Sequence, residues 1–246
     1  MLRFAFLVSL CASAANVLAA PTPPPRVILV GDSTMAPRTG YGDALCARFD
    51  PAVACLNLAR GGRSSGSYRA EGLWDKVQEH LRDSAPYSAT YVLIQFGHND
   101  QPGKPGRSTD LVTQYPANLA RYVSEARALG AVPILVTPLT RRSFRGPWLH
   151  DDLAPWSATV RTIARGQKAD LLDLNKHSAA AVQAMGTAQA DTLAQEPPPP
   201  EPLPEGRKSA FDRTHVGPKG AALFSGMVMR DLVRLRPALA ASLRRP

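Results

Sequence analysis

Hydrophobic segments rich in β-branched residues alternate along the chain with longer segments in which apolar residues recur at helical spacing. The hydrophobic segments contain few polar positions, which is typical of strands that are buried on both faces. Five strands are predicted, at 26–31, 52–59, 89–97, 131–138 and 169–175. Helices are predicted between and after them, at 42–49, 68–82, 115–129, 155–168, 176–192 and 218–235.

These repeated strand–helix units predict an α/β fold in which a parallel sheet is covered by helices on both faces. In such sheets, ligands bind outside the carboxyl ends of the strands. Ser33 follows the first strand, "RGGRSS" (60–65) follows the second, and "HND" (98–100) follows the third. We therefore expect these three polar segments to lie together at one edge of the sheet.

The N-terminal segment, 1–20, has the composition of a secretory signal peptide. Arg3 precedes an apolar stretch that is short for a membrane span, and small residues follow it. We expect this segment to be removed and 21–246 to form a single exported domain, periplasmic or extracellular, without stable membrane insertion. Retention as an anchor is the alternative. Within the domain, the proline-rich segment 196–204 is expected to form an extended loop.

The chain is strongly basic, with a net charge of +9 that falls to +8 when Arg3 is removed with the signal peptide. Such a charge favours an anionic partner: nucleic acid, a membrane surface or an acidic polysaccharide. No basic run exceeds two residues and no aromatic residues interleave with the basic ones, which argues against nucleic acid. The sequence carries no signal of oligomeric state.

Two cysteines, Cys46 and Cys55, remain after removal of Cys11 with the signal peptide. An oxidising compartment would allow a disulfide between them. Two free thiols agree equally well with the sequence, because spacing alone does not fix the geometry that a disulfide requires.

Ser33 is a candidate nucleophile if the chain supplies a base, a carboxylate to orient it and donors for the oxyanion. His215 is the candidate base, because Asp212 lies three residues earlier and can hold one ring nitrogen while the other addresses the serine. Gly62 offers an unobstructed backbone N–H, and Asn99 offers a neutral amide donor. Each of these residues singly is also common in turns and loops.

Five segments of the sequence resemble, in order, those of the SGNH or GDSL-type hydrolases, and in particular the rhamnogalacturonan acetylesterase branch. They are "GDSTMA" (31–36), "GRSSGSY" (62–68), "FGHND" (96–100), "VTPLTRRSF" (136–144) and the D-x-T-H segment "DRTH" (212–215). The resemblance implies a three-layer α/β/α sandwich with a flavodoxin-like, five-stranded parallel sheet. It also implies no metal or other cofactor, and removal of acetyl groups from pectic polysaccharide.

By the same resemblance, Ser33, Asp212 and His215 are the catalytic residues. The oxyanion hole is formed by the backbone N–H groups of Ser33 and Gly62 and by the Asn99 amide. The proline-rich segment departs from the compact segment expected ahead of "DRTH", which leaves the shape of the cleft wall open.

Candidate substrate contacts are basic, because pectic chains carry galacturonate carboxylates that guanidinium groups bind with paired hydrogen bonds. The candidates are Arg63, Arg69, His98, Arg141 and Arg142. Solvated or structurally ion-paired arginines are the alternative. Two other functions stay open: an SGNH esterase, lipase or thioesterase acting on another acyl substrate, such as acetylated xylan or lipid, and a non-catalytic polysaccharide-binding module.

Overall fold

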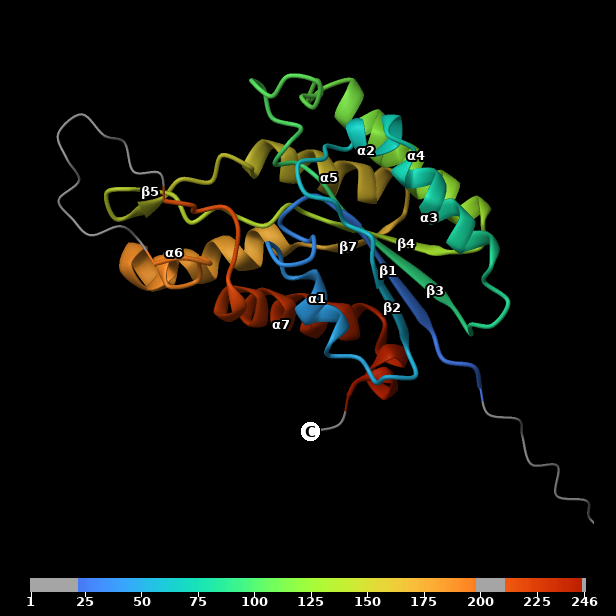
Figure 1. Ribbon diagram of the computed structural model, residues 1–246. Coiled ribbons are helices and arrows are strands. Elements are labelled where there is room, and N and C mark those ends of the chain that lie inside the picture. Colours follow the sequence, from blue (N-terminus) through green and yellow to red (C-terminus); the bar gives the residue numbers. More distant parts are fainter. Residues whose placement is uncertain (1–21, 198–210, 245–246) are drawn as a thin grey trace, which may run out of the picture.

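The computed structural model describes residues 22–197 and 211–244; the expected signal peptide and most of the proline-rich segment lie outside the described residues. Within these residues, five strands form one parallel sheet in the order β2-β1-β3-β4-β7 (Figure 1). The strands are β1 (Arg26–Gly31), β2 (Ala54–Asn57), β3 (Thr90–Gln95), β4 (Val132–Val136) and β7 (Asp170–Leu172). This is the flavodoxin-like strand order, and it confirms the predicted fold class.

One face of the sheet is covered by α2 (Ser67–Ala70), α3 (Leu73–Arg82), α4 (Gln114–Ala128) and α5 (Ala154–Gly166) (Figure 1). Alternate strand residues point into this layer, among them Ile28 of β1 and Ile94 of β3, where they pack against Trp74 and Trp156 of the helices. The core on this side is rich in large aromatic side chains.

The opposite face is covered by α1 (Gly42–Cys46), α6 (Leu174–Asp191), α7 (Pro218–Leu235) and the 3₁₀ helix η1 (Pro237–Ser242). The other set of strand residues, including Leu29 and Leu93, packs here against Phe224 and Leu232 of α7. The two cores show why β1 and β3 read as continuous apolar runs: every residue of both strands is buried.

Three details differ from the predicted elements. The helix predicted at 68–82 is two helices, because Gly72 has a φ of +71°, in the left-handed region that favours glycine. The long loop 138–154 contains a short hairpin of β5 (Phe144–Arg145) and β6 (Trp148–Leu149). Helix α6 starts at Leu174 and is interrupted at Gly186.

A disulfide joins Cys46, the last residue of α1, to Cys55 of β2, with 5.4 Å between their Cα atoms. Of the two states that the sequence left open, the structure therefore has the bridged one. The bond connects the helix that follows the Ser33 loop to the strand that leads into the Gly62 loop. No helix in the described ranges is both long and apolar enough to cross a membrane.

Candidate active site

Ser33 lies in the loop after β1, at the carboxyl edge of the sheet where the strand order reverses between β2 and β3. The residue is 9% exposed. Thr39 connects this loop to the D-x-T-H segment: its hydroxyl donates to the Ser33 carbonyl over 2.7 Å, and its own carbonyl accepts the N–H of Val216 over 3.0 Å. The residue after His215 is therefore fastened to the loop that carries the serine.

Asp212 and His215 form the pair that their spacing predicted. The His215 Nδ1 lies 2.7 Å from Asp212 Oδ2, while Oδ1 accepts the backbone N–H groups of Thr214 at 2.8 Å and His215 at 3.0 Å. Burial alone would raise the pKa of Asp212, but these hydrogen bonds and the imidazole hold it below its ordinary value. The carboxylate thus stays ionised and orients the ring, which leaves Nε2 available for proton transfer.

The candidate oxyanion donors belong to the loops that follow β2 and β3. A Cβ built on Gly61 would lie 3.7 Å from the Ser33 Cβ, so the Gly61–Gly62 segment runs directly beside the serine. Gly62 has a φ of +78°, which favours glycine and turns the backbone of this segment. The Asn99 amide donates one proton to the Arg63 carbonyl over 3.1 Å, and an amide has a second proton for a ligand.

Asp100 holds these two donor loops together, a role that the sequence did not indicate. Its side chain is fully buried, and its Oδ1 accepts the Ser65 hydroxyl at 2.6 Å, the Ser65 N–H at 3.0 Å and the Thr109 hydroxyl at 2.9 Å. Burial raises the pKa of Asp100 to about 6 in spite of these donors. The carboxyl next to Asn99 therefore fixes the segment that contains Gly62.

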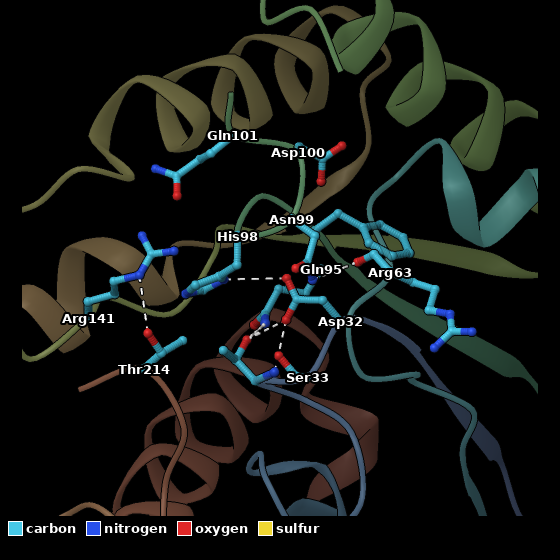
Figure 2. A network of polar contacts seen from close by, with 12 residues as sticks. Asp32, Ser33, Arg63, Gln95, His98, Asn99, Asp100, Gln101, Arg141 and Thr214 are labelled. Atoms are coloured by element: carbon cyan, nitrogen blue, oxygen red, sulfur yellow. Dashed lines mark hydrogen bonds and ion pairs between the residues drawn. The ribbon is translucent and has the colours of Figure 1, made fainter. Parts of the chain in front are cut away.

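A second buried carboxyl, Asp32, lies under the serine loop. Its Oδ1 accepts the Thr34 N–H at 2.9 Å and hydroxyl at 2.7 Å, and its Oδ2 lies 3.3 Å from His98 Nδ1 (Figure 2). Burial alone would raise the pKa of Asp32, but the neighbouring His98 and the Thr34 hydrogen bonds hold it below its ordinary value. The prediction that His98 contacts substrate is wrong, because the residue is 2% exposed and its ring faces Asp32.

The sequence matches an established family over most of its length. Residues 29–223 match the GDSL-like lipase/acylhydrolase family. The chain is also 30% identical over 222 residues to the rhamnogalacturonan acetylesterase RhgT of Bacillus subtilis (strain 168), which covers 86% of this chain and 91% of the relative. The chain belongs to the GDSL-like lipase/acylhydrolase family. It is thus a carboxylic ester hydrolase, of the branch that contains the rhamnogalacturonan acetylesterases.

Solved structures share the fold of this hydrolase. The Bacillus subtilis protein YxiM has a TM-score of 0.66 at 22% identity, over 87% of this chain and 57% of that protein. A catalytic mutant of Axe2, an acetylxylan esterase from Geobacillus stearothermophilus, has a TM-score of 0.59 at 17% identity, over 87% and 94% of the two chains. At these identities the likeness concerns the fold alone.

The prediction that Arg142 of this hydrolase contacts substrate is also wrong, because its side chain is fully buried. Its Nη2 donates to the carbonyls of both Asp212 and His215 at 2.8 Å, and its backbone N–H donates to the Arg213 carbonyl at 2.8 Å. Arg142 therefore supports the segment that carries Asp212 and His215. The sequence around Arg142 does not indicate this role, because the residues that accept its hydrogen bonds lie 70 or more positions further along the chain.

The three other arginines predicted to contact substrate are ion-paired in the structure. Arg69 binds Glu125 at 2.8 Å and lies over the Tyr122 ring, which makes it a structural residue. Arg63 pairs with Glu71 at 2.9 Å and is partly exposed. Arg141 pairs with Asp152 at 2.5 Å. It also donates to the hydroxyl of Thr214, the residue before His215, over 3.2 Å (Figure 2). Substrate contact by Arg63 and Arg141 stays a prediction.

The loops at this edge of the sheet thus carry a serine hydroxyl, an imidazole–carboxylate pair, a side-chain amide and glycine backbone. Within residues 22–197 and 211–244, no three side chains of His, Cys, Asp or Glu gather in an arrangement that could hold a metal ion. What this arrangement can do chemically is transfer an acyl group through the serine hydroxyl.

Proposed function

We propose that this hydrolase is exported and removes O-acetyl groups from a pectic polysaccharide of the rhamnogalacturonan type, with Ser33 as its nucleophile. The observation that carries the proposal is the Asp212–His215 pair, which is fastened to the Ser33 loop through Thr39. The Gly61–Gly62 segment runs beside the serine, and Asn99 is hydrogen-bonded to Arg63, which follows that segment. The basic charge of the chain and its signal-like N-terminal segment support an acidic substrate outside the cytoplasm.

The relatives support the substrate. RhgT is a rhamnogalacturonan acetylesterase, and YesY of the same Bacillus subtilis strain is described as probably one, at 27% identity over 217 residues. A rhamnogalacturonan acetylesterase of Emericella nidulans is 41% identical over 75 residues, which is 30% of this chain. An enzyme for long acyl chains would need an apolar channel at Ser33, whereas the segments beside the serine are rich in glycine and arginine.

The reaction proceeds in two steps. His215 accepts the Ser33 proton as Oγ attacks the acetyl carbonyl, and Asp212 stabilises the imidazolium that forms. The N–H groups of Ser33 and Gly62 and the Asn99 amide stabilise the oxyanion. His215 then protonates the departing sugar hydroxyl, which leaves an acetyl-enzyme. Water activated by the same imidazole releases acetate and restores the serine.

The experiment is acetate release from acetylated rhamnogalacturonan and acetylated xylan by the wild type and Ser33→Ala. We expect rhamnogalacturonan to be preferred, and Ser33→Ala to lose activity by about 10⁴-fold or more while keeping its fold, because the nucleophile is gone. Circular dichroism checks the fold. Activity of Ser33→Ala within tenfold of the wild type would refute the assignment of the nucleophile, and a preference for xylan would refute the substrate. The N-terminal residue of the protein recovered from the culture medium or periplasm tests export.

A further inference from the structure

A cavity of about 600 Å³ is lined by residues of the Ser33 loop and of the Gly61 segment. It lies between the 36–39 segment of the serine loop, the 57–61 segment after the edge strand β2, and the start of α3. Two of its lining residues also touch the serine: Thr39 donates to the Ser33 carbonyl, and Gly61 runs beside the Ser33 side chain. The cavity therefore shares two residues with the surroundings of Ser33.

The lining of the cavity combines apolar surface with unpaired positive charge. Leu58 and Leu73 contribute apolar surface, and Arg38, Arg60 and Lys76 contribute three cations, while no aspartate or glutamate lines it. All three cations are exposed. None of them forms an ion pair with a carboxylate among the described residues. Arg63, Arg69 and Arg141 differ in this respect, since each has an acidic partner.

The backbone at Arg38 supports a role for its side chain. Arg38 has a φ of +68°, a left-handed conformation that costs a residue other than glycine, asparagine or aspartate of order 1 kcal/mol. The turn is held in place, because the Thr39 N–H donates to the Pro37 carbonyl over 2.9 Å and the Gln195 amide donates to the Arg38 carbonyl. Glycine would fit this turn without strain, but it would place no guanidinium at the cavity.

We propose that this cavity is a subsite for a carboxylate-bearing sugar, a uronic acid residue of the same chain as the acetylated one, bound by Arg38, Arg60 and Lys76. Guanidinium groups bind a carboxylate through paired, charge-assisted hydrogen bonds, and the leucines pack against the apolar face of the sugar ring. The volume lies in the range of sites that bind small ligands. This inference rests on the proposed function, because it concerns a sugar of the chain whose ester Ser33 cleaves.

The direct test compares an Arg60→Gln/Lys76→Gln variant with an Arg165→Gln/Lys176→Gln control. The control removes the same two charges from exposed positions that do not line the cavity and form no side-chain hydrogen bond or ion pair among the described residues. Substrates are acetylated rhamnogalacturonan oligosaccharides with free carboxylates and the same oligosaccharides methyl-esterified. The measured quantity is the ratio of kcat/KM for the free acid to that for the methyl ester.

We expect this ratio to fall about 5- to 20-fold in the cavity variant, since each exposed charge contact contributes a factor of about 2 to 5. The control should keep the wild-type ratio within twofold. The loss should shrink at high salt, because exposed charges are screened. A wild-type ratio near one, or equal changes in the cavity and control variants, would overturn the inference.

Binding is measured separately, by calorimetric titration of the intact protein with an unacetylated oligogalacturonate. This measurement does not depend on any hydrolytic activity, so it distinguishes failure of the subsite from failure of the proposed function. The Kd should rise 5- to 20-fold in the cavity variant and stay unchanged in the control. Failure of the wild type to bind the oligogalacturonate, or equal Kd values for the two variants, contradicts the subsite even if acetylated pectin is hydrolysed.

Discussion

Replacement of the buried arginine behind the catalytic pair tests how the site is held. Arg142→Met removes the two hydrogen bonds that Nη2 donates to the Asp212 and His215 carbonyls, each 2.8 Å long. Methionine is unbranched and fills much of the same space. The variant therefore keeps the packing around residues 212–215, but the Asp212 and His215 carbonyls lose the donor that holds them in place.

The effect on stability should be modest. Hydrogen bonds from a charged donor contribute about 1.5–3 kcal/mol each, but burial of a guanidinium costs several kcal/mol. The cost of burying the Arg142 guanidinium is only partly offset. Burial lowers its pKa, and its Nε and Nη1 have no hydrogen-bond partner among the described residues. We expect the free energy of unfolding to fall by only about 1–3 kcal/mol. Activity should fall much further, by about 100-fold in kcat/KM, because a displacement of about 1 Å in a catalytic group has that effect.

Arg26→Met is the matched control. Arg26 is also a buried arginine that donates to a carbonyl, that of Asp83 at 2.9 Å, and its Nε and Nη2 are likewise without partners in the described chain. It lies at the opposite end of β1 from the site. The assay is hydrolysis of p-nitrophenyl acetate, with urea denaturation for stability.

We expect both variants to lose similar stability and only Arg142→Met to lose activity. Its pH profile should also change: removal of a cation near Asp212 raises the pKa of that carboxyl, so activity should be lost at a higher pH on the acid side. The reasoning is refuted if Arg142→Met keeps kcat/KM within threefold of the wild type, or if the two variants lose activity equally.

Three further predictions concern Asn99, the buried carboxyl of Asp100 and the disulfide. Asn99→Ala should lower kcat about 10²- to 10³-fold with little change in KM, because one oxyanion donor is lost; a change in KM alone would contradict this role. Because burial raises the pKa of Asp100 to about 6 from 3.8, the folded protein binds the extra proton, and stability present at low pH is lost as pH rises from about 4 to 6. The loss amounts to about 3 kcal/mol, and Asp100→Asn should abolish it. Urea denaturation across pH 4 to 7 measures the free energy of unfolding; if its dependence on pH is the same in the variant and the wild type, the effect is excluded. A Cys46→Ser/Cys55→Ser variant should lose about 2–3 kcal/mol of stability by the loop-entropy relation, and equal stability of wild type and variant would show that the bridge contributes nothing.

The strands and most helices could be predicted from local pattern. Runs such as "RVILV" are buried on both faces by helices of two layers, so their continuous hydrophobicity carried the signal. The break between α2 and α3 was missed because the apolar spacing continues through Gly72, whose left-handed φ the pattern does not encode. The β5–β6 hairpin was missed because strands of two residues are too short for any periodicity.

The site residues also divide into those whose contacts are local in sequence, which could be predicted, and those whose contacts join distant positions, which could not. Asp212 and His215 are three positions apart, so their contact is local and their spacing indicated it. The contacts of His98 with Asp32 and of Arg142 with the D-x-T-H segment join residues 66 to 73 positions apart, and only the folded sheet brings them together. Charge at the edge of the sheet suggested substrate binding, but charge alone does not separate an exposed arginine from a buried one.

The hydrogen bonds between loops determine whether the site loses its conformational entropy during folding or during substrate binding. Hydrogen bonds join Thr39 to Val216 and Asn99 to Arg63. Others join Asp100 to Ser65 and Arg142 to the carbonyls of Asp212 and His215. Loops fastened to one another lose their freedom during folding, and little remains to be lost when a sugar chain arrives. Backbone amides such as those of Val216 and Ser65 should therefore exchange with deuterium as slowly as amides in regular secondary structure, although they belong to loops. A site built in this way selects its substrate by a shape that exists before binding.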